Sequence, residues 1–286
     1  MTLKLIASDM DGTLLDNNDG LTKDNAKALK QITDQGVVFC VASGRSLSGV
    51  AHILDRYDIP FCAILGNGSE FYNRDHERTM TRYFPKDKIP GVAAIFEEED
   101  VNCMIFAKDE HYYSLRDPDM VREDFLERTA HYFHKDIDKL RSDPNAAIPA
   151  RSLVKIDMDT LVNGDIDVIK MEAFAIDINR IVRCREKLKA IEGVSYLASC
   201  DDNVEVTDIT AQKGLMLEEV IRDMGITKDE VIVLGDGMND LSLFERFPYS
   251  YAPGNATDVI KAKAHKVVSS HTESDVKDAI EDFLKI

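Results

Sequence analysis

The sequence LKLIASDMDGT, residues 3–13, decides how the rest of this chain is interpreted. Its first half is an apolar run that predicts a strand buried on both faces. Two carboxylates, Asp9 and Asp11, follow where that strand should end, and Gly12 allows the backbone to turn sharply. In an open α/β sheet, ligands bind beyond the carboxyl ends of the strands. Two acids placed there repel each other, which favours a hard cation between them. The same residues are also typical of a strand followed by an ordinary Asp-Gly turn.

The composition limits the classes of protein that this chain can represent. Its 286 residues are enough for one large or two ordinary domains, and 44% of them are hydrophobic. The formal net charge of −17 argues against nucleic acid as a partner, because phosphate backbones require basic patches. An anionic substrate would need local cations to offset that charge. No stretch predicts a transmembrane span or a signal peptide, so no membrane partner is expected.

The five cysteines are odd in number and include no Cys-x-x-Cys pair. They are expected to be reduced, which predicts a cytoplasmic protein. The oligomeric state is left open between a monomer and a small homo-oligomer.

Strand and helix patterns predict two kinds of domain in one chain. Near-continuous apolar strands alternate with helices in residues 1–83 and again in residues 195–286. This pattern predicts a doubly wound, parallel, Rossmann-like α/β core. In residues 84–194 the strands alternate more with polar residues, as in a sheet with one wet face. We therefore predict a smaller α+β domain inserted into the core.

Several predicted element ends of the core carry residues suited to one task. The first strand ends in the two carboxylates described above. Ser43 and Gly44 end the second strand just before a helix, Lys213 begins a later helix, and GDGMND, residues 235–240, follows a later strand. A hydroxyl and backbone N–H groups near a helix N-terminus suit an anion, and carboxylates suit Mg²⁺. Together with a lysine, these are the groups that phosphoryl transfer requires.

Most of these residues also have an ordinary structural explanation. Lys213 could be a solvated lysine at a helix start, although lysine is unfavourable beside the positive end of a helix dipole. Asn239 and Asp240 could cap a helix. Arg45, directly after Gly44, could form a salt bridge at the edge of the sheet.

Taken together, four segments resemble, in order and spacing, the four motifs of the haloacid dehalogenase-like phosphatase superfamily. The insertion is similar to the type II cap of its Cof-like subgroup, and the resemblance covers essentially the whole chain. Four motifs in order are far more specific than any one of them. Pro253 and Ser69 depart from the usual pattern, and these departures concern substrate contacts rather than the chemistry. The segments are DMDGT at 9–13, SGR at 43–45, KG at 213–214 and GDGMND at 235–240, with further similarity in GNG at 66–68, VTD at 206–208 and GNA at 254–256.

The resemblance implies a role for each residue of the site. Asp9 is implied as the nucleophile that forms an aspartyl-phosphate, and Asp11 as the general acid and then the general base. Mg²⁺ is the implied cofactor. Its implied ligands are Asp9, the backbone carbonyl of Asp11, Asp236 and Asn239. Asp240 and Arg45 are implied to contact these ligands without binding the metal themselves. The phosphoryl group is implied to be held by the N–H groups of Met10 and Gly44, by Ser43 and by Lys213.

The leading prediction is therefore a Mg²⁺-dependent phosphatase for a small phosphorylated metabolite, such as a sugar phosphate. The resemblance also implies that the active site lies where cap and core meet, and that closure of the cap excludes water. A phosphomutase with the same pair of aspartates is one alternative, although the mutases of this superfamily carry a smaller cap elsewhere. A non-catalytic regulator that binds a metabolite is another, but every catalytic position is filled here.

Overall fold

The computed structural model describes residues 2–18, 20–144, 146–198 and 200–285. The chain divides into two compact units. Met1–Arg82 and Thr210–Ile286 form the first, which we call the core unit. Tyr83–Ile209 form the second, which we call the inserted unit.

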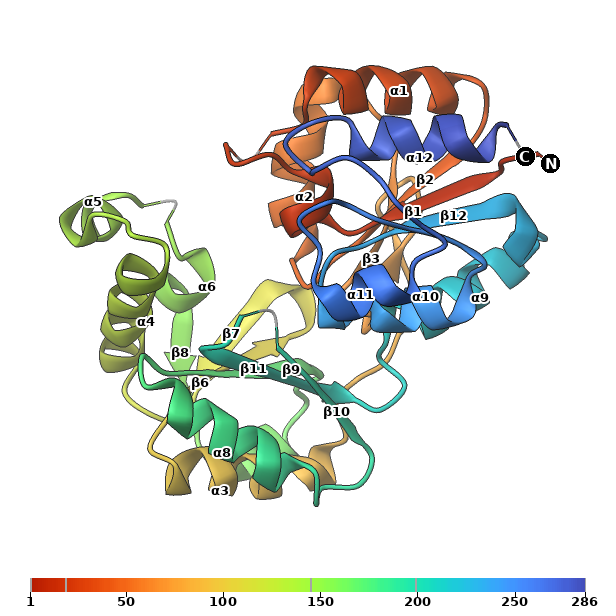
Figure 1. Cartoon of the computed structure of the whole chain (residues 1–286). Coiled ribbons are helices and arrows are strands. Elements are labelled where there is room, and N and C mark those ends of the chain that lie inside the picture. Colours follow the sequence, from red (N-terminus) through yellow and green to blue (C-terminus); the bar gives the residue numbers. More distant parts are fainter. Residues whose placement is uncertain (1, 19, 145, 199, 286) are drawn as a thin grey trace. The chain divides into compact units, whose positions relative to one another are not determined.

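An eight-stranded sheet forms the centre of the core unit (Figure 1). Its order is β14-β13-β12-β1-β2-β3-β4-β5, and the pairs from β14 to β3 are parallel. The hairpin of β4 and β5 extends the sheet with antiparallel pairs. Strand β1 therefore lies where the chain changes direction across the sheet, which is where ligands bind in folds of this type. The strands are β1 (Leu5–Ser8), β2 (Val38–Ala42), β3 (Cys62–Leu65), β4 (Glu70–Tyr72), β5 (Arg78–Thr81), β12 (Val231–Leu234), β13 (Tyr249–Ala252) and β14 (Lys266–Val267).

Helices cover both faces of this sheet, because successive side chains of a strand point to opposite faces. Ile6 and Phe39 pack on one face with α1, α2 and α12, whereas Leu5 and Cys40 pack on the other with α9, α10 and α11. This arrangement confirms the predicted doubly wound α/β core. The helices are α1 (Lys23–Asp34), α2 (Leu47–Leu54), α9 (Lys213–Asp223), α10 (Leu241–Arg246), α11 (Asp258–Lys263) and α12 (Asp275–Phe283).

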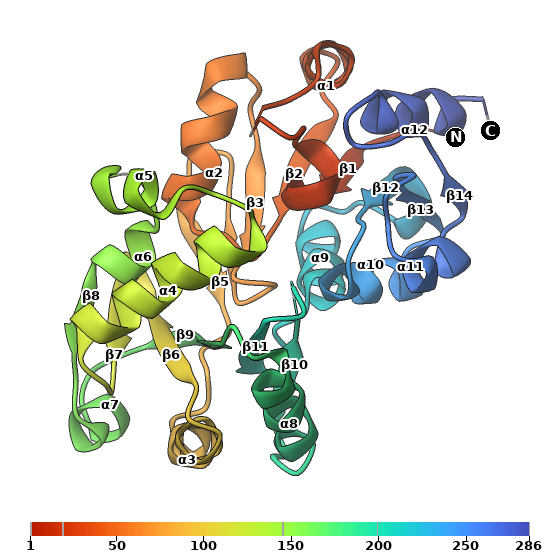
Figure 2. The ribbon, with the colours of Figure 1, turned by 60° about the vertical axis from the view of Figure 1, so that its left-hand side comes forward.

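A six-stranded sheet of order β10-β11-β9-β6-β7-β8 forms the inserted unit. Its pairs are antiparallel except for the parallel pair of β7 and β8. Helices α3 and α8 pack on one face and α4 on the other (Figure 2). The elements are α3 (Ile89–Glu98), β6 (Asn102–Ala107), β7 (His111–Ser114), α4 (Pro118–Tyr132), α5 (Ile137–Ser142), α6 (Ile148–Arg151), β8 (Leu153–Lys155), α7 (Met158–Asn163), β9 (Val168–Phe174), α8 (Ile178–Leu188), β10 (Val194–Leu197) and β11 (Asn203–Asp208).

The second boundary of the insertion lies later in the chain than the sequence predicts. The sequence pattern assigns residues 195–209 to the core, whereas strands β10 and β11 belong to the sheet of the inserted unit. Strand β11 pairs with β9, where Glu205 lies opposite Glu172. A strand's own residues indicate its two faces but not its partners, because pairing depends on segments distant in sequence. The inserted unit therefore ends at Ile209 rather than near Val194.

The structure also describes the state of the cysteines and the lengths of the helices. All five cysteines are free thiols. None of the helices in the described ranges is both long enough and apolar enough to cross a membrane.

A buried polar pair joins α1 to α12. Asn25 Nδ2 donates a hydrogen bond of 2.7 Å to Asp275 Oδ1, and both side chains are buried. Asp275 Oδ2 has no hydrogen-bond partner within the described ranges. Burial raises the pKa of Asp275 to about 7, because the lost hydration of the carboxylate outweighs its hydrogen bonds, of which the one from Asn25 is the strongest.

Asp275 makes the stability of the core depend on pH, and Asp275→Asn should remove that dependence. Its folded-state pKa lies above the ordinary value of 3.8, so its contribution to stability is complete at low pH and is lost as pH rises toward 7. The wild type should lose up to about 1.4 kcal/mol per pH unit relative to the variant in that window. Urea unfolding from pH 4 to 8 measures the difference, with exposed Asp223→Asn as control. If the free energies of unfolding of wild type and Asp275→Asn differed by the same amount at every pH from 4 to 8, the raised pKa of Asp275 would be contradicted.

Candidate active site

The predicted site residues come from separate segments that end at one edge of the core sheet. Asp9 directly follows β1, Ser43 directly follows β2, and Asp236 lies two residues beyond β12. Lys213 is the first residue of α9. Neighbouring parallel strands bring their carboxyl ends to the same edge, so these side chains lie in one region. Between the two aspartates of the first motif, Met10 buries its side chain in the core and leaves only its backbone for a ligand.

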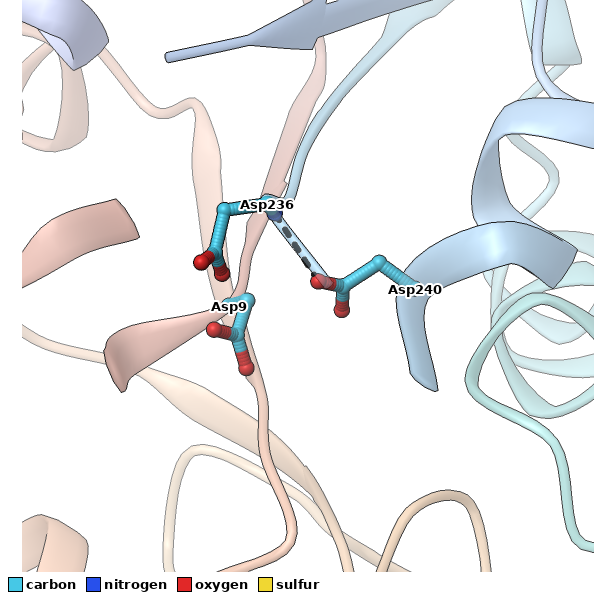
Figure 3. A group of neighbouring side chains, drawn as sticks. All are labelled: Asp9, Asp236 and Asp240. Atoms are coloured by element: carbon cyan, nitrogen blue, oxygen red, sulfur yellow. Dashed lines mark hydrogen bonds between the residues drawn. The ribbon is translucent and has the colours of Figure 1, made fainter. Parts of the chain in front are cut away.

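Three carboxylates gather at this edge. Ligand oxygens of Asp9, Asp236 and Asp240 all lie within 4.8 Å of one another. Figure 3 shows Asp9 at the end of β1, Asp236 in the loop after β12 and Asp240 in the helical turn before α10, with their side chains converging. Asp9 and Asp240 are buried, and Asp236 is partly exposed. The side chain of Asp11 is not part of this group.

A buried lysine joins two of these carboxylates. Lys213 Nζ donates hydrogen bonds to Asp9 Oδ1 at 2.7 Å and to Asp240 Oδ1 at 2.6 Å. Its side chain is fully buried, which rules out a solvated lysine at a helix start. Burial by itself would lower the pKa of Lys213, but the charges of Asp240 and Asp9 outweigh burial and raise it above its ordinary value. Lys213 is therefore a fixed positive charge.

The cluster still carries an excess of negative charge. Three carboxylates and one ammonium group leave two charges uncompensated. Burial raises the pKa of Asp9 well above its ordinary value, opposed by Lys213 and reinforced by Asp240 and Asp236. Burial and the charge of Asp240 likewise raise the pKa of Asp236 to about 6. One divalent cation would neutralise the excess, and a cluster of carboxylate oxygens suits Mg²⁺. The donor set therefore fits the expected metal.

The hydrogen bonds distinguish Asp240 from its neighbours. Its Oδ1 accepts from Lys213, and its Oδ2 accepts from the backbone N–H groups of Asp236 and Gly237 at 3.0 and 3.1 Å. Both oxygens of Asp240 are thus occupied within the protein. The side chain of Asn239, in contrast, is half-buried and makes no hydrogen bond in the described ranges. This arrangement is the one expected if Asp236 and Asn239 bind a metal while Asp240 orients the loop, and the assignment stays a prediction.

The turn after β1 is built against Asp236. Gly12 has φ +80°, and a Cβ there would meet Asp236 Oδ2 at 2.4 Å, so only glycine fits. Thr13 Oγ1 donates to Asp236 Oδ1 at 3.2 Å, and Asn255 Nδ2 donates to the Gly12 carbonyl at 2.7 Å. The sequence alone did not predict a role for Thr13 or Asn255. Thr13 lies in the segment DMDGT and Asn255 in the segment GNA, so their place in these motifs was the signal that could have identified them.

The loop after β2 contacts the first motif. Ser43 Oγ accepts from the backbone N–H of Arg45 at 3.2 Å, and the Ser43 carbonyl accepts from that of Asn67 at 3.0 Å. Gly44 lies between Ser43 and Arg45. The Arg45 side chain donates from Nε to Asp11 Oδ2 at 2.8 Å and from Nη2 to Asp11 Oδ1 at 2.6 Å. Arg45 thus forms a salt bridge, and its partner is the predicted acid and base.

The sequence matches a known family over most of its length. The sequence profile of the haloacid dehalogenase-like hydrolase family matches residues 6–280. The chain belongs to this family. It is 24% identical over 295 residues to the 5-amino-6-(5-phospho-D-ribitylamino)uracil phosphatase YwtE of Bacillus subtilis, covering 99% of this chain and 98% of that protein. It is 23% identical over 289 residues to the pyridoxal phosphate phosphatase YbhA of Escherichia coli, covering 99% of this chain and all of that protein.

The fold of this haloacid dehalogenase-like chain also matches solved structures. A haloacid dehalogenase-like hydrolase from B. subtilis superposes with a TM-score of 0.82 at 23% identity, covering 98% of this chain and 99% of that chain. The predicted family and the predicted enzyme class, a phosphatase of this family, are confirmed. The roles of individual site residues stay predictions.

Mg²⁺ should stabilise the protein through the surplus negative charge of the carboxylate cluster. At a free concentration of 100 times Kd, bound Mg²⁺ should add about 2.7 kcal/mol to the free energy of unfolding. Asp236→Asn should lose most of this gain, although the variant without metal should be as stable as the wild type because one repelling charge is gone. Thermal unfolding with EDTA or Mg²⁺ measures both effects. Exposed Asp229→Asn is the control, and an equal Mg²⁺ shift in Asp236→Asn would refute the site.

Lys213→Met should destabilise the core strongly. The substitution leaves Asp9 and Asp240 buried beside each other without a cation, which typically costs about 3–5 kcal/mol. Urea unfolding in EDTA at neutral pH measures the loss, and exposed Lys228→Met should change the free energy of unfolding by less than about 1 kcal/mol. A loss in Lys213→Met as small as in the control would contradict a structural role of the buried ion pairs.

Proposed function

We propose that this protein is a Mg²⁺-dependent phosphatase that hydrolyses small phosphomonoesters through an aspartyl-phosphate on Asp9. The observation that supports the proposal best is the buried contact between Asp9 and Lys213 beside two further carboxylates. A carboxylate that could act as nucleophile, a fixed cation and a cluster of oxygens that could bind a divalent metal would thus act together at one edge of the sheet. Phosphoryl transfer requires this combination, because its catalysis consists mainly of positioning and charge neutralisation.

The proposed reaction has two steps. First, a carboxylate oxygen of Asp9 attacks phosphorus, the bond from phosphorus to the leaving oxygen breaks, and Asp11 gives that oxygen its proton. Next, water attacks the phosphorus of the aspartyl-phosphate and loses a proton to Asp11. The bond between Asp9 and phosphorus then breaks and inorganic phosphate leaves. Only after the second step are Asp9 and Asp11 back in their starting forms.

The other residues would bind the phosphoryl group and offset its negative charge during these steps. Lys213 is already bonded to Asp9 and would also attract the phosphoryl oxygens. Ser43 and the N–H groups of Gly44 and Met10 are proposed to complete the phosphoryl pocket. Mg²⁺, held by Asp9, Asp236, Asn239 and the Asp11 carbonyl, would neutralise charge on the nucleophile and on the phosphoryl group.

The proposed substrates are small phosphorylated metabolites, with sugar phosphates as the first class to test. By their names, the two relatives act on a phosphoribitylamino-uracil and on pyridoxal phosphate. These compounds share a phosphate monoester on a small molecule and differ elsewhere. The chemistry at Asp9 would therefore be common to such substrates, while the choice among them would depend on residues outside the carboxylate cluster.

Asp9→Asn should abolish phosphate release, because an amide is a poor nucleophile and binds metal weakly. A loss of at least about a thousandfold is expected, comparable to removal of a nucleophile elsewhere. Phosphate release is measured with Mg²⁺ on sugar phosphates, pyridoxal phosphate and 4-nitrophenyl phosphate, with Asp229→Asn as control. In Asp11→Asn, the second step lacks its base, so phosphate should accumulate on Asp9 during turnover of 4-nitrophenyl phosphate and be visible by mass spectrometry after acid quench.

Two results would count against this mechanism. Unchanged phosphate release in Asp9→Asn would remove Asp9 as nucleophile. Phosphate release that is as fast in EDTA as in Mg²⁺ would rule out the proposed Mg²⁺ dependence.

A further inference from the structure

The salt bridge between Arg45 and Asp11 contributes too little to stability for stability to explain it. The guanidinium donates two hydrogen bonds, of 2.8 and 2.6 Å, one to each oxygen of the carboxylate. The side chains are 29% and 56% exposed, so water screens the pair and it adds little to stability. The bidentate form nevertheless restricts the direction of the carboxylate, because the guanidinium is planar and rigid.

The backbone at both ends of this contact is itself held in place. The Arg45 N–H donates to Ser43 Oγ at 3.2 Å, and the Arg45 carbonyl accepts from the Gly66 N–H at 3.4 Å. On the other side, Asn255 Nδ2 holds the carbonyl of Gly12, the residue after Asp11. The pair thus spans two anchored loops, one after β1 and one after β2. A contact between anchored groups can set the position of a side chain that is otherwise exposed.

We propose that Arg45 is the positioning residue for Asp11, and this inference rests on the proposed function. Arg45 holds the Asp11 carboxyl so that one of its oxygens exchanges a proton with the leaving oxygen and later with water. One hydrogen bond opens while that oxygen carries the proton, and the other keeps the side chain in place. When the bond from phosphorus to the leaving oxygen breaks, the proton moves from Asp11 to that oxygen. The resulting carboxylate accepts both bonds from Arg45 again and is ready to take a proton from the attacking water.

The competing role for Arg45 is direct contact with the phosphoryl group. Both roles would lower activity when Arg45 is removed, but they differ in how the loss depends on the leaving group. Help from a general acid matters only when the leaving oxygen needs a proton. Contact with the phosphoryl group matters equally for every ester, because that group is the same in all of them.

The test measures kcat/KM for a series of phenyl phosphates in the full-length chain with Mg²⁺. This quantity covers the steps up to departure of the leaving group. At one end, 4-nitrophenyl phosphate releases a phenolate that needs no proton; at the other, 4-methylphenyl phosphate releases one that does. Arg45→Met should lose about tenfold or more on the 4-methylphenyl ester and less than about threefold on the 4-nitrophenyl ester, since general acids contribute about 10²–10⁴-fold. Arg45→Lys should give a smaller selective loss, because it offers a single point of contact.

A double-mutant cycle decides whether Arg45 acts through Asp11. In Asp11→Asn, adding Arg45→Met should change kcat/KM by less than about twofold on either ester. Equal losses on all esters, or an undiminished effect of Arg45→Met in Asp11→Asn, would overturn the proposal. Exposed Arg141→Met, which loses a salt bridge in the inserted unit, is the control and should leave every rate unchanged.

Failure of the proposed function would look different. A wild-type protein that releases no phosphate from any ester would refute the phosphatase, whereas an active wild type with unselective Arg45 variants would refute only the positioning role. If Arg45→Met does not fold, Arg45→Lys and its combination with Asp11→Asn carry the same comparison.

Discussion

The buried ammonium group of Lys213 is the constraint on which the rest of the site depends. It is the first residue of α9 and bonds both Asp9, at the end of β1, and Asp240, directly before α10. Removing Lys213 would leave the carboxylates of Asp9 and Asp240 buried beside each other without a cation. The packing around α9 supports this position, since the N–H of Gly214 donates to Ser242 Oγ at 2.9 Å and a Cβ at Gly214 would meet the Ser242 carbonyl oxygen at 2.2 Å. One lysine therefore ties three segments of the core to a common point.

The same cluster explains how an acidic protein can handle an anionic substrate. The chain carries a net charge of −17, which would repel a phosphate ester at long range. At the strand ends, however, the protein gathers a buried lysine and three carboxylates. Their excess negative charge equals the charge of one divalent cation. Short-range interactions in a partly buried site are screened far less than those on the surface. With a divalent cation bound there, as proposed, the local field would matter more to a phosphate ester than the charge of the whole chain.

Much of the core and its chemistry could be predicted from local patterns, and the limits of that approach are physical. Apolar strands that alternate with helices predicted the doubly wound sheet, because strands buried on both faces have few other solutions. Residues 195–209, which include most of β10 and all of β11, were assigned to the wrong unit, because their residue types indicate faces but not partners. Likewise the sequence could not decide whether Lys213 was solvated. Its burial follows from two carboxylates that lie far from it in the chain.

The sequence alone determined which chemical groups are available and at which strand ends they occur. The order of DMDGT, SGR, KG and GDGMND indicated the family, since each motif is a short local pattern. Only the tertiary structure decided which side chains meet: Lys213 with Asp9 and Asp240, Thr13 with Asp236, and Arg45 with Asp11. The reason is that these contacts cross between neighbouring strand ends, where geometry depends on sheet order and register. Residue types can suggest a salt bridge for Arg45, but only the pairing of β1 with β2 places Asp11 within its reach.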